Sequence, residues 1–132
     1  MDVQDIRKIE TYLRRLFGNE RIRVTPAPRN KNAAEVYIAD DKLGELQADE
    51  EDEEDYNFTM EFRTGASADI PELNSYLSRK FGNDRLRVQR RARKQDSLEA
   101  YLGDEFVGVL FIENGKTGRS CILEIPILGV DL

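Results

Sequence analysis

An internal repeat constrains the fold of this chain more than any other feature of its sequence. Shifting the sequence by 64 positions places residues 76–88, YLSRKFGNDRLRV, on residues 12–24, YLRRLFGNERIRV, with nine of thirteen residues identical and no gap. The same register places residues 99–104 on residues 35–40, and it becomes a shift of 65 only near the end of each copy. Chance does not produce so long a match, so the two halves of the chain must build the same elements.

Each copy is expected to begin with a helix, because its apolar residues follow the spacing of three or four positions that places them on one helix face. These residues are Ile6, Ile9 and Leu13, with counterparts at Ile70, Leu73 and Leu77. Asp2 or Asp5 can cap the start of the first helix, and Asp69 precedes the second. Gly-Asn pairs at residues 18–19 and 82–83 can supply the left-handed turn that ends each helix.

Antiparallel strands are expected to follow each helix. Residues 21–24 and 85–88 alternate arginine with aliphatic residues, which is the two-residue period of a strand with one buried face. The next apolar segments, residues 34–46 and 98–112, fit either a hairpin or a bent strand around a tight turn. We expect three strands in each copy, or four if these segments are hairpins.

These elements predict an α+β protein with two tandem helix-plus-three-strand (αβββ) repeats and antiparallel sheets. The first repeat covers residues 1–64 and the second covers residues 65–132. A unit of about 60 residues buries only a marginal core by itself. We therefore expect the repeats to pack as a pseudo-twofold dimer and to form one compact structural unit.

The composition disfavours several classes of function. The chain has no histidine, which is the commonest general base and a frequent metal ligand, and it has no phosphate-binding glycine loop. Its one cysteine, Cys121, lies in an apolar run and is expected to be buried. We expect no enzyme, no catalytic residue, no cofactor and no metal site. No apolar run is long enough to span a membrane and no secretory signal opens the chain, so we expect a cytoplasmic protein without a membrane partner.

Two charged segments are the candidate partner-binding sites. The acidic segment is Asp49, Glu50, Glu51, Asp52, Glu53, Glu54 and Asp55. The basic segment is Arg85, Arg87, Arg90, Arg91, Arg93 and Lys94. A flexible, solvated loop is the simplest interpretation of the acidic run, and a basic protein partner or loosely held divalent cations are the alternatives. The basic segment could form ion pairs with acids of the other repeat, or it could grip phosphates.

The second copy resembles a known family of short bacterial proteins. Residues 76–83, YLSRKFGN, residues 99–110, EAYLGDEFVGVL, and residues 128–132, LGVDL, are similar to domain-of-unknown-function family 3126. The first copy departs from that pattern at Lys42 and Glu45. The resemblance implies a duplicated bacterial domain, and it brings no activity, substrate or catalytic residue with it.

The expected function is a noncatalytic protein-interaction module: a small bacterial cytoplasmic adaptor, assembly factor or chaperone-like protein. Its partner would be another protein, and the chain itself would be a monomeric pseudo-dimer or a homo-oligomer. The alternative is nucleic-acid binding through the basic segment of residues 85–94. The net charge of −6 disfavours that alternative, because nucleic-acid binding usually rests on a broad positive field.

Overall fold

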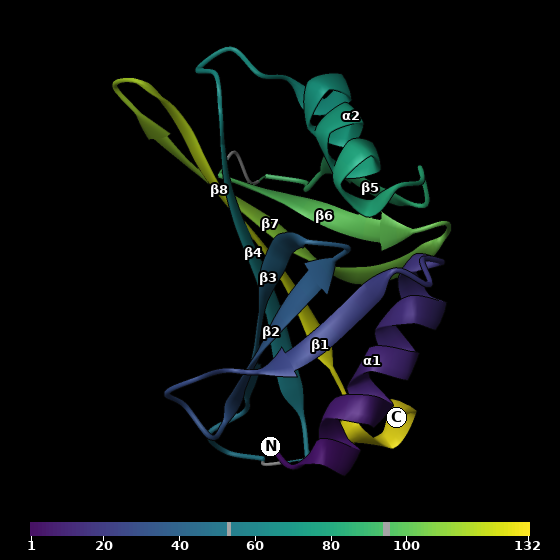
Figure 1. Cartoon of the computed structure of the whole chain (residues 1–132). Coiled ribbons are helices and arrows are strands. Elements are labelled where there is room, and N and C mark those ends of the chain that lie inside the picture. Colours follow the sequence, from purple (N-terminus) through teal and green to yellow (C-terminus); the bar gives the residue numbers. More distant parts are fainter. Residues whose placement is uncertain (53, 94–95) are drawn as a thin grey trace. The chain divides into compact units, whose positions relative to one another are not determined.

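The computed structural model describes residues 1–52, 54–93 and 96–132 and has an α+β fold (Figure 1). Within these residues the first copy contains α1 (Val3–Phe17), β1 (Ile22–Pro26), β2 (Ala33–Ile38), β3 (Asp41–Ala48) and β4 (Tyr56–Thr64). The second copy contains α2 (Ile70–Phe81), β5 (Leu86–Arg90), β6 (Ser97–Leu102), β7 (Glu105–Gly115), β8 (Gly118–Ile127) and a short 3-10 turn, η1 (Gly129–Asp131). Each copy therefore runs from a helix into antiparallel strands, as the repeat predicts.

The prediction of three strands in each copy is wrong, because each copy has four within the described residues. The difference lies in the tight turns after Ile38 and Leu102. Ala39 and Gly103 adopt left-handed backbone conformations, with φ of 53° and 61°. A positive φ in a two-residue loop reverses the chain completely and forms a hairpin. The chain between these turns is therefore two paired strands and not one bent strand.

The helices begin and end where the sequence predicts. Asp2 accepts a hydrogen bond from the Asp5 backbone at 2.8 Å, and the Asp5 side chain accepts one from the Asp2 backbone at 3.3 Å, which is a capping box. Asp69 caps α2 through the backbone N–H of Glu72 at 3.1 Å. Both helices end at a glycine in the left-handed region, Gly18 and Gly82.

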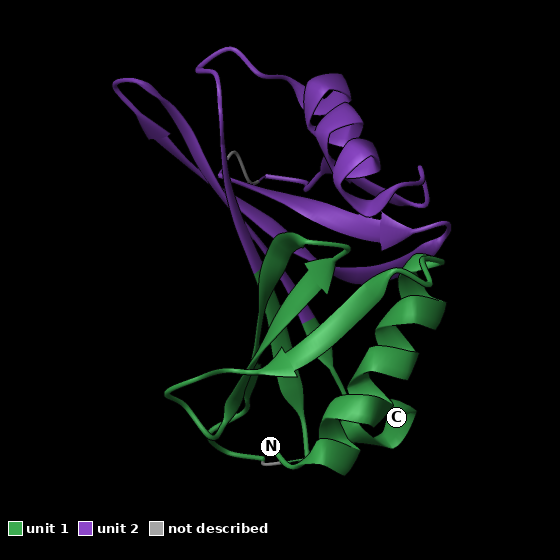
Figure 2. Ribbon diagram, in the orientation of Figure 1, with its two compact units in different colours: residues 1–59, 126–132 green, residues 60–125 purple. Residues whose placement is uncertain are grey.

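The chain divides into two compact units, which Figure 2 shows in different colours. Unit 1 contains Met1–Thr59 and Pro126–Leu132, and unit 2 contains Met60–Ile125. The boundaries between the units therefore fall inside β4 and β8, and not at the start of the second copy. Each unit contains one helix and completes its sheet with the end of a strand from the other copy.

In unit 1 the strands follow the order β1-β2-β3-β4, and all pairs are antiparallel. Helix α1 packs on β1 through a buried stripe that includes Ile9 and Leu13. The Phe17 ring, at the end of this helix, lies 6.1 Å from the Phe58 ring of β4. Aromatic contact and aliphatic burial together fix the helix against one sheet face.

Unit 2 repeats this plan with the order β5-β6-β7-β8. Helix α2 packs on β5, and the Tyr76 ring of α2 stacks on the Phe62 ring of β4 with centroids 4.4 Å apart. A bulge between Ala100 and Tyr101 matches one between Val36 and Tyr37, at the shift of 64. The repeat thus preserves even a local irregularity of the sheet.

Two equivalent glycines, Gly44 of β3 and Gly108 of β7, allow close approach of the neighbouring strand. A Cβ atom at Gly44 would lie 2.3 Å from the carbonyl oxygen of Thr59, and one at Gly108 would lie 2.1 Å from that of Glu124. No larger residue fits without displacing the backbone. In each unit the sheet face opposite its helix is covered by no helix of that unit within the described residues. We call this the helix-free face.

Candidate interaction surfaces

An apolar strip lies on the helix-free face of unit 2. Gly108 and Leu110 of β7 point into the core, so the alternating residues Val109 and Phe111 point away from it. Phe111 pairs with Ile122 of β8, whose neighbours are buried, and 42% of Phe111 is exposed. We define the apolar strip as Phe106, Val109, Phe111 and Ile122.

Phe106 extends the strip toward the turn between β6 and β7. It pairs with Tyr101, and the two rings meet edge to face with centroids 5.7 Å apart. Phe106 is 53% exposed, which is unusual for so large an apolar side chain. A contiguous exposed apolar patch on a monomeric protein is often a binding site.

The first repeat carries polar residues at all four positions of the strip. The counterparts of Phe106, Val109, Phe111 and Ile122 are Lys42, Glu45, Gln47 and Asn57. The Lys42 ammonium lies 2.8 Å from the Glu45 carboxylate and 2.9 Å from that of Glu35. The hydrogen bonds to Glu45 and then Glu35 raise the pKa of Lys42 above its usual range. The helix-free face of unit 1 is therefore a solvated ionic surface built on the same backbone.

Carboxylates flank the apolar strip on both sides. Val109 pairs with Glu99 of β6 and with Glu124 of β8, so one acid lies on either side of it across the sheet. The Tyr101 hydroxyl donates to the Glu99 carboxylate at 3.0 Å, and this bond raises the pKa of Tyr101. A cation also lies in this region, because Arg87 of β5 pairs with Tyr101 of β6. The strip therefore combines apolar contacts at its centre with negative charge beside them.

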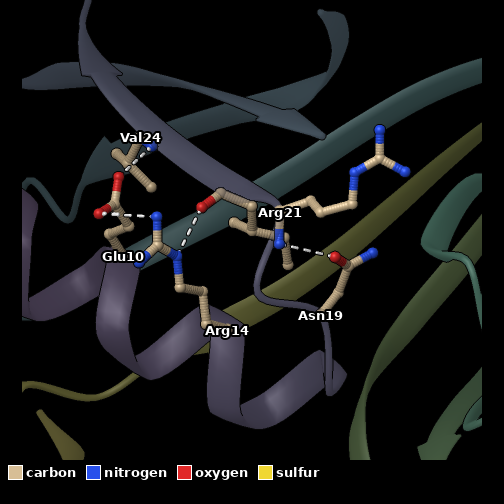
Figure 3. A network of polar contacts seen from close by, with 6 residues as sticks. Glu10, Arg14, Asn19, Arg21 and Val24 are labelled. Atoms are coloured by element: carbon tan, nitrogen blue, oxygen red, sulfur yellow. Dashed lines mark hydrogen bonds and ion pairs between the residues drawn. The ribbon is translucent and has the colours of Figure 1, made fainter. Parts of the chain in front are cut away.

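The outer edge of β1 is covered by side chains of α1 (Figure 3). Glu10 accepts a hydrogen bond from the Val24 backbone at 2.9 Å, and Arg14 donates one to the Ile22 carbonyl at 2.8 Å. The two side chains also form an ion pair at 3.3 Å. These contacts occupy backbone groups that an added strand would need, so they disfavour strand addition here.

Asn74 plays the same part at β5 in unit 2. It is the counterpart of Glu10, and only 8% of it is exposed. Its side-chain oxygen accepts from the Val88 N–H at 2.7 Å, and its amide nitrogen donates to the Val88 carbonyl at 3.3 Å. One amide thus satisfies both outward-facing groups of Val88, whereas in unit 1 Glu10 binds the N–H of Val24 and Arg14 binds the carbonyl of Ile22.

The acidic segment forms a closed loop between β3 and β4. Asp49 donates its N–H to the Asp55 carbonyl at 2.8 Å, and the Asp49 and Asp52 carboxylates each accept from a backbone N–H two residues later. The Asp55 carboxylate accepts from the Gly129 N–H at 2.8 Å. Glu50, Glu51, Asp52 and Glu54 are exposed, whereas Glu53 lies outside the described residues. Local turns therefore order the described part of this acidic run.

A polar cavity of about 510 Å³ lies beside this loop in unit 1. Its lining is Met1, Asp5, Asn30, Asn32, Gln47, Ala48, Asp49, Glu50 and Tyr56. Tyr56, which is only 6% exposed, forms part of this lining. Burial, followed by the charges of Asp5 and Asp2, raises the pKa of Tyr56. The cavity lining therefore combines carboxylates, side-chain amides and a tyrosine.

Part of the basic segment lies on β5 and at its start. Arg85, Arg87 and Arg90 are exposed, and Arg93 is exposed in the loop after the strand with φ of 64°. Arg91 is engaged differently, because its guanidinium donates to the Ser97 hydroxyl at 3.2 Å. Lys94 lies outside the described residues.

Three further expectations concern the cysteine, a membrane span and a metal site. Cys121 is buried, as predicted, and burial raises the pKa of its thiol. Neither described helix is long and apolar enough to cross a membrane. Across residues 1–52, 54–93 and 96–132, no three candidate ligands among cysteine and acidic side chains gather as a metal-binding group.

The sites predicted from the sequence, which are the acidic and the basic segments, include neither the apolar strip nor the cavity. A signal for the strip is nevertheless present in the sequence. Residues 106–112, FVGVLFI, are apolar at positions that face both sides of a strand, whereas residues 42–48, KLGELQA, alternate between polar and apolar side chains. A strand with two apolar faces indicates that both faces are covered. No comparable signal exists for the cavity, whose lining comes from four separate segments of the chain.

Comparison with known proteins gives one family. The model of the family described as "Protein of unknown function (DUF3126)" matches residues 5–62 and again residues 69–131. Searches of curated proteins and of solved structures return no significant match. The two matches follow the two copies of the internal repeat and together cover most of the chain. This chain belongs to the DUF3126 family and is a tandem duplication of its domain.

Proposed function

We propose that this protein is a noncatalytic protein-interaction module of the bacterial cytoplasm that binds a basic amphipathic segment of another protein on the helix-free face of unit 2. The observation that carries the proposal is the apolar strip. Duplication provides the same backbone twice, and only the second copy has exposed Phe106 and Phe111 where the first has Lys42 and Gln47. Since the cores match, the difference points to a role of the face and not to folding.

The charge beside the strip supports a basic occupant. Glu99 and Glu124 flank Val109 across the sheet. A second copy of the chain would bring the same carboxylates to the contact, which is unfavourable. A segment with apolar residues on one side and lysine or arginine beside them complements both features.

The size of the strip also suits a short segment. The largest apolar patch on a typical monomer is about 300–600 Å², whereas a standard interface between two folded proteins needs about 800 Å² from each partner. Four apolar side chains, of which Val109 and Ile122 are only partly exposed, fall well short of the area that a second folded protein would need. An amphipathic helix laid along β7 and β8 would cover them.

Edge-strand addition is a less favourable mode of binding. Glu10 and Arg14 occupy the outer backbone groups of β1, and Asn74 occupies those of Val88 in β5. A partner strand would have to displace these side chains and leave buried polar groups unpaired. The proposed occupant therefore meets a sheet face.

The test uses a designed amphipathic helix of leucine and lysine, labelled with a fluorophore, and a matched helix with glutamate in place of lysine. Anisotropy should report saturable binding of the lysine helix and not of the glutamate helix. A variant that carries the residues of the first copy, Val109→Glu with Phe111→Gln, should lose at least tenfold in affinity. The control on the equivalent face of unit 1, Gln47→Ala with Asn57→Ala, should bind normally.

If the strip variant and the control variant bound the lysine helix equally well, the proposal would be refuted, because the helix would then bind somewhere other than the strip. Sedimentation of the protein alone gives a second check. Formation of dimers that the strip variant abolishes would show that the strip binds another copy, and this would also contradict the proposed partner.

Nucleic-acid binding remains the second candidate, and the exposure of Arg87 and Arg90 on β5, with Arg85 just before it, favours it. It predicts that a labelled single-stranded oligonucleotide binds and that affinity falls steeply as salt is raised. The variant Arg90→Glu with Arg87→Glu should abolish that binding. Absence of binding at low salt would exclude this candidate.

A further inference from the structure

We propose that the segment bound on the apolar strip is an amphipathic helix with a basic residue near its middle and an acidic residue toward one end, and that Arg63 binds the acidic residue. This inference rests on the proposed function, because it specifies the charge pattern of the partner at the same face. It starts from a cation that lies at one end of the strip.

Arg63 lies on the helix-free face of unit 2. Phe62, directly before it in β4, is buried and stacks on Tyr76 of α2, so Phe62 points to the face that the helix covers. Successive side chains of a strand point to opposite faces, and Arg63 is exposed. The guanidinium is therefore on the same face as the apolar strip.

Contacts with two hydroxyl groups place Arg63 at one end of the strip. Its Nη2 atom donates to the Thr117 hydroxyl at 3.2 Å, and its Nη1 atom lies 3.5 Å from the Ser120 hydroxyl. Ser120 precedes Ile122 of the strip by two residues, so both side chains lie on one face of β8. Arg63 thus marks the end of the strip toward the turn between β7 and β8 (Figure 1).

The Arg63 guanidinium retains binding capacity for an anion. Both of its partners are neutral, and no carboxylate of the described residues forms an ion pair with it. Glu113 pairs with Ser120 from β7, so β8 lies between this acid and β4. A guanidinium has five N–H donors and binds a carboxylate through two parallel hydrogen bonds. The hydroxyls therefore hold the arginine without neutralising it.

The charge beside the strip changes along the strands. Val109 lies between Glu99 and Glu124, and Glu124 is four residues from Ser120 along β8. Four residues of a strand span about 13 Å. Residues seven or eight apart on a helix are separated by about 10.5–12 Å along its axis and point to nearly the same side. A base and an acid at this spacing would meet the carboxylates and Arg63 together.

The internal repeat links these features to the strip. The counterpart of Arg63 is Leu128, and the counterpart of Glu124 is Thr59. Unit 1 therefore lacks the cation and the second carboxylate as well as the apolar side chains. Because all three features occur only in the second unit, a single occupant that contacts all of them explains the difference.

The experiment compares two fluorophore-labelled helices that differ only in the charge of one end. The first is the leucine–lysine helix. The second, the glutamate-end helix, has glutamate in place of lysine in one terminal turn, seven residues from a central lysine. Both are acetylated and amidated so that their termini are neutral. Anisotropy gives the ratio of the affinity for the glutamate-end helix to the affinity for the leucine–lysine helix.

The variant Arg63→Glu should lower this ratio about fivefold, because an exposed ion pair becomes a repulsion. Arg7→Glu makes the same change of charge at an exposed position of α1, and it should lower the ratio by less than about twofold. An unchanged ratio for Arg63→Glu, or an equal fall in both variants, would overturn the inference. Circular dichroism confirms that each variant is folded.

Paramagnetic broadening locates the two ends of the bound helix. A nitroxide on the glutamate end should broaden the amides of Thr117 and Ser120, and a nitroxide on the opposite end should broaden that of Phe106. Equal broadening of both regions by either label would show that the helix has no fixed direction, which would also overturn the inference.

The strip variant separates this inference from the proposed function. If Val109→Glu with Phe111→Gln weakens both helices while Arg63→Glu leaves the ratio unchanged, the proposed function stands and the charge pattern is wrong. If the strip variant weakens neither helix, the proposed function fails and the inference fails with it.

Discussion

Replacement of Asn74 by alanine tests how the fold protects the edge of β5. The Asn74 side chain makes two hydrogen bonds to Val88, at 2.7 and 3.3 Å, and only 8% of the residue is exposed. The substitution leaves the N–H and the C=O of Val88 without these partners. Each lost bond contributes about 1 kcal/mol, and a buried group left unpaired costs about 1–3 kcal/mol.

The expected loss in the free energy of unfolding is about 2–3 kcal/mol. Alanine recovers roughly 0.6 kcal/mol through its higher helix propensity, and this gain is included. Equilibrium unfolding in urea measures the change, and with a slope of about 2 kcal/mol per molar the midpoint should fall by roughly 1–1.5 M. Ser75→Ala, an exposed position of the same helix, should shift the free energy by less than about 0.5 kcal/mol. A loss for Asn74→Ala no larger than that of Ser75→Ala would refute the edge-protection account.

Two further predictions concern packing and pH. Gly108→Ala should destabilise the protein by about 1–3 kcal/mol in urea unfolding, because its Cβ atom would lie 2.1 Å from the Glu124 carbonyl oxygen. Gly65→Ala, which meets no atom within 4 Å, should be nearly neutral, and equal effects would contradict the register of β7 and β8. Burial raises the pKa of Cys121 above 9.0 and that of Tyr56 above 10.0, so the unfolded chain loses these protons first. The free energy of unfolding should therefore fall as pH rises above about 9; a constant or rising value between pH 8 and 10.5 would contradict this.

The sequence predicts the plan of each copy because the plan depends on local patterns. The helix stripe of Ile6, Ile9 and Leu13, the caps at Asp2 and Asp69, and the alternating first strands all follow from short-range periodicity. The number of strands does not follow in the same way. A bent strand and a hairpin share one hydrophobic pattern, and the positive φ at Ala39 that decides between them is not encoded by a glycine.

The candidate surfaces depend on contacts between distant segments. Asn74 is a polar residue on a helix, and only the approach of β5 shows that it binds Val88. Tyr56 belongs to a regular alternating strand, and only the loops around it show that its hydroxyl lies at a cavity. The apolar strip could have been predicted from the sequence. The segment FVGVLFI lacks the alternation of polar and apolar residues that its counterpart KLGELQA shows.

The most direct test of the proposed function is a ¹⁵N correlation spectrum of the full chain, titrated with the leucine–lysine helix. Binding to the strip predicts saturable shifts centred on the amides of Val109, Phe111 and Ile122, with the equivalent amides of Glu45, Gln47 and Asn57 unchanged. Shifts confined to the acidic loop of residues 49–55, or no shifts at all, would contradict the account.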